Sequence, residues 1–108
     1  MQAQVVKGVR WNHPGIFPNF ATGTQVEITG PEDDEFLGWL PVTIEKWETF
    51  VPESYLKGER LNRSYNPTEL EVQIGEILEI LEIANAWLLA KTEYGKIGWI
   101  PAERVVSI

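Results

Sequence analysis

Short apolar runs separated by turn residues dominate the second half of the chain. The segment 76–83 is rich in isoleucine and leucine and carries a glutamate at every third position, so its periodicity fits a strand or a helix. Gly75 directly before it and Asn85 soon after it favour a strand. Several short strands joined by tight turns predict an all-β barrel or sandwich. Further strands are expected at 87–91, 97–100 and 105–108, with a helical turn at 101–104.

The first half of the chain repeats the same order of elements. The distance from the tryptophan to the proline is 13 residues in the first copy and 14 in the second. Three matched blocks in one order predict an internal duplication. The first copy carries additional polar residues at 30–35, which are typical of a surface loop. The matched blocks are 23–28, 39–42 and 50–56 in the first copy and 75–80, 87–90 and 99–105 in the second.

The second copy resembles the Src homology 3 family in three ordered motifs. Residues 69–82 resemble the family's Glu-Leu-x-Phe-x-x-Gly-Asp-hydrophobic segment, 87–91 its Trp-Trp-Leu-Ala-Arg strand, and 95–101 its Gly-x-x-Gly-hydrophobic-hydrophobic-Pro segment. The likeness covers roughly residues 58–106, and the first copy, 4–57, is assigned mostly by its similarity to the second. The resemblance implies an all-β fold of two small Src homology 3-like barrels in tandem, packed against each other. The implied domains are 1–57 and 58–108.

Members of this family bind extended proline-rich peptides in a groove of aromatic side chains. In the second copy, Trp87, Pro101 and Tyr65 fall on groove positions. Arg63 and Arg104 stand where the family has two further tyrosines. The resemblance therefore implies an incomplete groove in this copy.

The first copy keeps a tryptophan, a proline and a tyrosine at groove positions, and another tryptophan lies in its N-terminal region. An acidic run shortly before the groove tryptophan can attract a lysine or arginine of a ligand, although a solvated loop is the simpler interpretation. Of the two copies, the first is therefore the better candidate for a peptide groove. Its candidate residues are Trp39, Pro52, Tyr55, Trp11, Glu32, Asp33 and Asp34.

Two interpretations of the tryptophans stay open. Trp39 and Trp87 can stack on a ligand, or they can cover apolar surface between the two barrels. A barrel of about 50 residues is only marginally stable by itself. Only residues 57–60 separate Leu56 from Leu61, and such a short linker predicts a fixed, partly apolar contact between the barrels.

Charge and composition narrow the range of functions. The net charge is −7 and the basic residues form no stripe, which argues against nucleic acid and anionic membranes and favours a basic or proline-rich peptide or protein surface. Cysteine is absent, which excludes disulfides and thiolate chemistry and fits a cytoplasmic location. The sequence contains no phosphate-binding loop, metal-ligand cluster or nucleophile motif, so we expect neither a cofactor nor an enzymatic activity.

The sequence thus favours two classes of function. The first is a non-enzymatic adaptor that binds a peptide or a protein surface. The second is a structural subunit that docks permanently onto a larger complex or associates with itself, with some of the five tryptophans as interface anchors.

Overall fold

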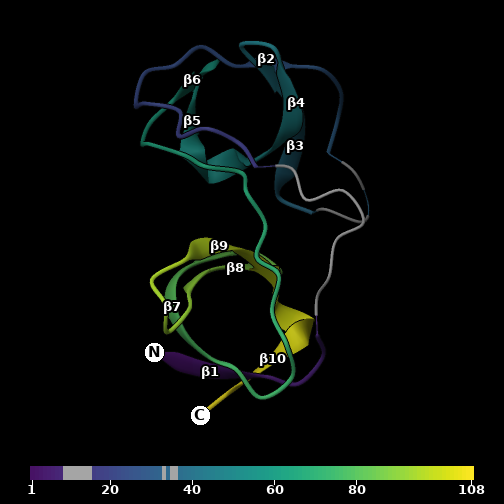
Figure 1. The fold of residues 1–108 in the computed structure, drawn as a ribbon. Coiled ribbons are helices and arrows are strands. Elements are labelled where there is room, and N and C mark those ends of the chain that lie inside the picture. Colours follow the sequence, from purple (N-terminus) through teal and green to yellow (C-terminus); the bar gives the residue numbers. More distant parts are fainter. Residues whose placement is uncertain (9–15, 33, 35–36) are drawn as a thin grey trace. The chain divides into compact units, whose positions relative to one another are not determined.

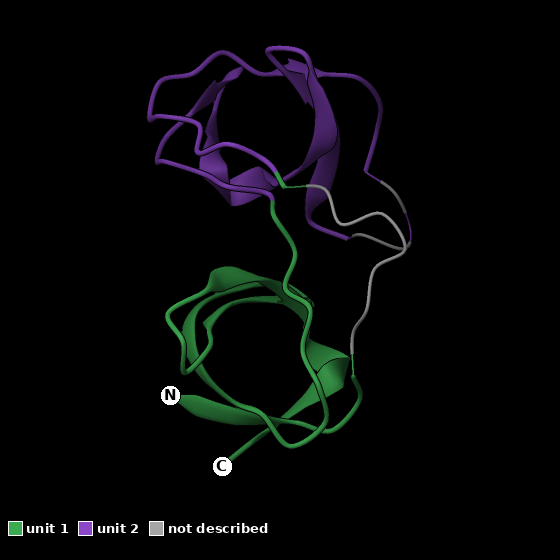
Figure 2. Cartoon of the chain, viewed as in Figure 1, with its two compact units in different colours: residues 1–16, 68–108 green, residues 17–67 purple. Residues whose placement is uncertain are grey.

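The computed structural model describes residues 1–8, 16–32, 34 and 37–108, which form short strands and two single-turn 3-10 helices (Figure 1). The predicted all-β class is confirmed. The chain divides into two compact units (Figure 2). Unit 1 comprises Met1–Ile16 and Thr68–Ile108, and unit 2 comprises Phe17–Pro67.

Unit 1 contains one five-stranded antiparallel sheet in the order β10-β1-β7-β8-β9. The segment 76–83 is extended, as the flanking Gly75 and Asn85 predicted, and the other strands and the helical turn also match the expected positions. The first strand of the unit comes from the N-terminus of the chain. Its elements are β1 (Gln2–Val5), β7 (Ile77–Ala84), β8 (Trp87–Lys91), β9 (Ile97–Pro101), the 3-10 helix η2 (Ala102–Arg104) and β10 (Val105–Ser107).

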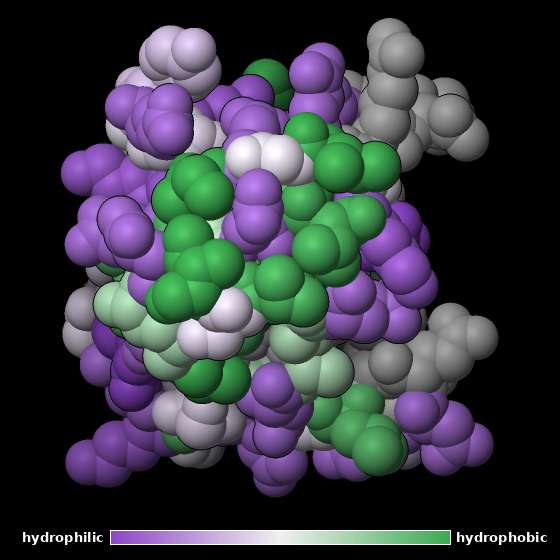
Figure 3. All heavy atoms as spheres, turned by 90° about the horizontal axis from the view of Figure 1, so that it is seen from below, coloured by the Kyte–Doolittle hydropathy of each residue, from purple (hydrophilic) through white to green (hydrophobic). Residues whose placement is uncertain are grey.

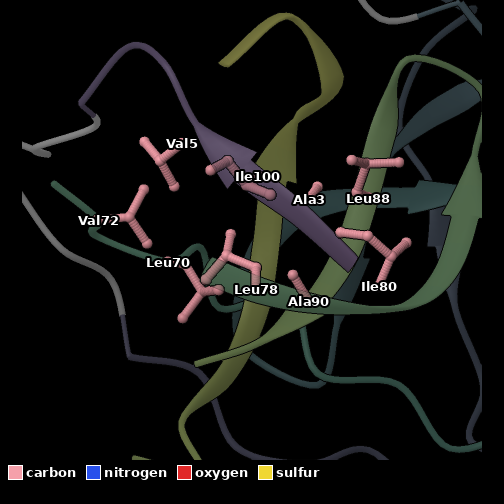
Figure 4. Packing of buried hydrophobic residues seen from close by; sticks show 9 residues of the cluster. All are labelled: Ala3, Val5, Leu70, Val72, Leu78, Ile80, Leu88, Ala90 and Ile100. Atoms are coloured by element: carbon pink, nitrogen blue, oxygen red, sulfur yellow. The ribbon is translucent and has the colours of Figure 1, made fainter. Parts of the chain in front are cut away.

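Alternation along the strands builds the core of unit 1. In β7, Leu78 and Ile80 are buried while Glu79 between them is exposed, as the alternation of a strand requires. The register shifts between Ile80 and Glu82, and beyond this shift Glu82 is half-buried. The inward side chains of several strands point toward one another (Figure 4). These are Ala3, Val5, Leu70, Val72, Leu78, Ile80, Leu88, Ala90 and Ile100. All are aliphatic, so this core is held by apolar burial.

One segment of unit 1 lies tightly against β9. Leu70 N–H donates to Trp99 O at 2.8 Å, and Trp99 N–H donates to Thr68 O at 3.0 Å. A Cβ on Gly98 would lie only 2.9 Å from Leu70 Cγ and 3.0 Å from Thr68 O. Glycine is therefore required at position 98 by the close approach of two backbone segments.

Unit 2 is built from short strands and one 3-10 helix that follow one another along the chain. Its sheets have the orders β2-β3-β4 and β5-β6, and a bridge between Gln25 and Arg60 links the two. Only the end of the expected strand at 23–28 forms a regular strand. The elements are β2 (Glu27–Ile28), β3 (Trp39–Ile44), β4 (Trp47–Pro52), the 3-10 helix η1 (Glu53–Tyr55), β5 (Leu56–Lys57) and β6 (Arg60–Leu61).

The division into units differs from the domains 1–57 and 58–108 that the sequence predicted. Strand β1 pairs with β7 and β10, so residues 2–5 belong to the sheet of unit 1. Strand β6 pairs with β5, and Tyr65 pairs with Phe20, so residues up to 67 belong to unit 2. The predicted contact between the two barrels stays a prediction.

Candidate functional site

In unit 1, a tryptophan and a proline lie side by side at the end of the β8–β9 hairpin. Trp87 and Pro101 are direct cross-strand partners, so their side chains lie on the same face of the sheet. Ala102 N–H donates to Ala86 O at 2.8 Å, which holds the start of η2 against the turn before β8. Trp87 and Pro101 are both half-buried. Their accessible parts form a small apolar platform on which a ligand can pack.

The same pair in unit 2 is buried. Trp39 at the start of β3 is the cross-strand partner of Pro52 at the end of β4, and Glu53 N–H donates to Gly38 O at 2.8 Å. Trp39 is only 5% exposed, and Pro52 is among the fully buried side chains. The tryptophan therefore has little surface with which to stack on a ligand.

The tyrosines of unit 2 form a packed cluster. The rings of Tyr55 and Tyr65 meet edge to face with their centroids 5.5 Å apart, and they are 4% and 3% exposed. Tyr65 Oη donates to Phe50 O, which satisfies the buried hydroxyl. The Arg63 guanidinium lies 4.2 Å from the centroid of the Tyr55 ring, a cation–π distance. Arg63, which the sequence marked only as a departure from the family pattern, therefore contacts the Tyr55 ring of this cluster.

The remaining predicted site residues fall outside this cluster or outside the described residues. Glu32 and Asp34 are exposed in the loop before β3. Trp11 and Asp33 lie outside the described residues. The structure therefore brings together Trp39 with Pro52, Tyr55 with Tyr65, and Trp87 with Pro101.

A carboxyl group of unit 1 is also affected by its surroundings. Glu69 forms a bridge with Trp99 in the segment that lies against β9. Partial removal from water raises the pKa of the Glu69 carboxyl, although the residue remains partly exposed to solvent. This carboxylate is therefore less stable in the folded chain than in water.

Apolar side chains are also exposed on unit 1. Val106 and Ile108 lie on or next to β10, and Leu81 and Ile83 lie on β7. Figure 3 shows hydrophobic residues gathered in the middle of the face seen from below. Exposed apolar groups of this kind often mark a protein-binding surface.

The described residues form neither a metal-binding cluster nor a membrane-spanning helix. No group of three or more histidine, cysteine or acidic side chains in this part of the chain is arranged to hold a metal ion. No helix within the described ranges has the length and apolar character needed to cross a membrane.

Comparison with known proteins identifies one family. The sequence model described as SH3 domain matches residues 63–102. This segment is an SH3 domain, a class of module that generally binds proteins and peptides. No curated protein and no solved structure matches the chain.

The matched segment does not coincide with either compact unit. Residues 63–67 lie in unit 2, and residues 68–102 lie in unit 1. Tyr65, which falls on a groove position of the family, thus lies in a different unit from Trp87 and Pro101. The usual set of groove residues is divided between the two units.

Proposed function

We propose that this chain is a non-enzymatic adaptor that binds an extended segment of a partner protein on unit 1, with Trp87 and Pro101 as the contact platform. The SH3 match at residues 63–102 supports a binding role. The observation that carries the choice of site is the contrast in burial, because Trp87 and Pro101 are half-exposed while their counterparts Trp39 and Pro52 are buried. The ligand site is therefore placed on the second copy, in contrast to the preference drawn from the sequence.

The proposed ligand is a proline-containing segment that carries basic residues. Proline-rich segments are already extended, so they lose little conformational entropy when they pack on an aromatic ring. The net charge of −7 attracts a basic partner and favours its association. Arg104, at the position of a groove tyrosine, donates from Nη1 to Gly8 O at 3.2 Å, and we expect this guanidinium to keep ligand cations away from that end of the platform.

Binding is tested by titrating the isotope-labelled full chain with proline-rich peptides, with and without arginine, and following the indole N–H signals. We expect the Trp87 signal to move, and Trp87→Ala to weaken binding at least about tenfold, as loss of an interface anchor does. Tyr94→Ala is the matched control, because Tyr94 is 92% exposed and lies in the turn at the opposite end of the β8–β9 hairpin. Unchanged affinity in Trp87→Ala would exclude this platform.

The alternative function is that of an assembly subunit. The exposed apolar residues of β7 and β10 favour it, because such side chains gain free energy when another surface covers them. Light scattering over a range of concentrations distinguishes the two proposals. A mass that stays at one chain at every concentration contradicts self-association.

A further inference from the structure

Strands β1 and β6 hold the same position in their respective units. In unit 1, β1 lies between β10 and the start of β7, with Gln4 opposite Val106. In unit 2, β6 lies beside β5, with Arg60 opposite Lys57 and a bridge from Arg60 to Gln25. The backbone hydrogen bonds correspond one to one. They are Val5 N to Glu76 O (2.9 Å) and Gly75 N to Val5 O (2.9 Å) in unit 1, and Leu61 N to Thr24 O (3.0 Å) and Gly23 N to Leu61 O (2.8 Å) in unit 2.

The sequence assigns these two strands the other way round. Strand β1 opens the first copy, whose other elements form unit 2. Strand β6 directly precedes the SH3 match at 63–102, most of which forms unit 1. We propose that the chain is a duplicated barrel whose two copies have exchanged their first strands, so that each sheet is completed by the strand that belongs in sequence to the other.

The link between the two copies supplies a physical reason for the exchange. Strand β5 ends at Lys57 and β6 begins at Arg60, so two residues form the turn of a hairpin. Gly58 has φ of 62°, and hairpin turns of type II′ require glycine with positive φ at this first position. A two-residue hairpin closes with a much smaller loss of chain entropy than pairing β5 with the distant β1. Strand β6 therefore takes the place beside β5, and β1 pairs with the sheet that is left without a first strand.

The exchange changes which residues form an aromatic cluster. Tyr65 belongs in sequence to the second copy, but it packs on Tyr55 in the unit that holds Trp39 and Pro52. Unit 2 therefore gains the tyrosine that the first copy lacks. Unit 1 is left with Trp87 and Pro101, without an N-terminal tyrosine among its described residues.

The exchange is tested by disulfide trapping in the full chain. The chain contains no cysteine, so the two introduced thiols are the only ones in each double variant. Gln4→Cys with Val106→Cys joins direct partners of the exchanged sheet, whose expected Cα separation of about 5.5 Å suits a disulfide. Lys57 holds in unit 2 the position that Val106 holds in unit 1. If the strands were not exchanged, β1 would pair with β5, and the double variant Gln4→Cys with Lys57→Cys would form the disulfide instead. The double variant Arg60→Cys with Val106→Cys tests the other half of the unexchanged arrangement, in which β6 would pair with β10.

Mild oxidation at low protein concentration, followed by non-reducing electrophoresis and peptide mass analysis, gives the readout. We expect near-complete intrachain closure of the Gln4–Val106 pair and almost none of the other two pairs. The reduced variants should keep the thermal midpoint of the parent, because all four positions are at least partly exposed. Closure of the Gln4–Lys57 pair in place of the Gln4–Val106 pair would overturn the exchange. A Gln4–Val106 disulfide that forms only between two chains would also overturn it. The same holds if neither the Gln4–Val106 pair nor the Gln4–Lys57 pair closes.

Discussion

Units 1 and 2 both place a tryptophan opposite a proline at the point where a hairpin leads into a 3-10 helix. In unit 2 the pair is buried, and in the tyrosine cluster of the same unit the Tyr65 hydroxyl donates to Phe50 O while the Arg63 guanidinium lies against the Tyr55 ring. In unit 1 the pair stays half-exposed, and Arg104 stands where a tyrosine would extend the platform. The same backbone position is thus buried in one unit and half-exposed to solvent in the other. Motif residues alone do not reveal this difference, because burial depends on the neighbours that each unit provides.

Removing each tryptophan in turn tests this contrast most strongly. Trp39→Ala should lower the free energy of unfolding by about 3–5 kcal/mol, the range for truncation of a buried aromatic side chain. Trp87→Ala should cost about half as much or less, because part of its ring is already in contact with water. Urea denaturation of both variants measures the two values. Equal losses would show that the two tryptophans do not differ in structural role.

A second test uses the closely packed glycine of unit 1. Gly98→Ala places a methyl group against Leu70 and Thr68, and overpacking of this kind costs about 1–3 kcal/mol. We expect the thermal midpoint to fall by roughly 4–8 °C for each kcal/mol lost. Thr49 occupies the corresponding position of β4, and Thr49→Ala should change the midpoint much less. A Gly98→Ala protein with an unchanged midpoint would mean that the segment at 68–70 does not lie against β9 as described.

The smallest expected effect concerns the pH dependence of unit 1. Because burial raises the pKa of Glu69 above its unfolded value, the folded chain holds this proton more firmly than the unfolded chain. The contribution of the protonated Glu69 carboxyl to folding stability is therefore present at acidic pH. It is lost as pH rises through the pKa that this carboxyl has in the folded chain. Glu69→Gln should remove that loss, so the variant gains stability relative to the parent at neutral pH. The gain should be small because the residue is partly exposed and water screens its charge. Urea midpoints at acidic and neutral pH provide the measurement, and a variant that follows the pH curve of the parent contradicts the assignment.

Local sequence patterns predicted strands β7 to β10 of unit 1 and the resemblance to the SH3 family at residues 63–102. Gly75 and Asn85 identified the ends of β7, and Trp87 and Pro101 marked a hairpin and a 3-10 turn that the structure contains. These features depend on residues close in sequence, where alternation and turn chemistry act directly. The first half was harder to interpret, since only Glu27–Ile28 of the segment 23–28 forms a regular strand.

The composition of the two units and the burial of the candidate site residues depend on pairings between residues that are far apart in the sequence. Nothing in residues 2–5 indicates that they pair with β7 and β10 instead of with the nearer first copy. Alternation assigns a strand its two faces, but it does not choose between two similar sheets that offer the same edge. For the same reason the sequence could not show that Tyr65 packs on Tyr55, or that Trp39 is buried while Trp87 is accessible.

The path of the chain through unit 1 also affects the order in which the protein can fold during synthesis. Unit 2 is one continuous stretch, so all its strands have left the ribosome once residue 67 has emerged. Strand β1 precedes unit 2 along the chain, whereas its partners β7 and β10 follow unit 2. We therefore expect β1 to remain unpaired on the nascent chain until β7 has emerged, which makes it a site where chaperones or proteases can act during that interval.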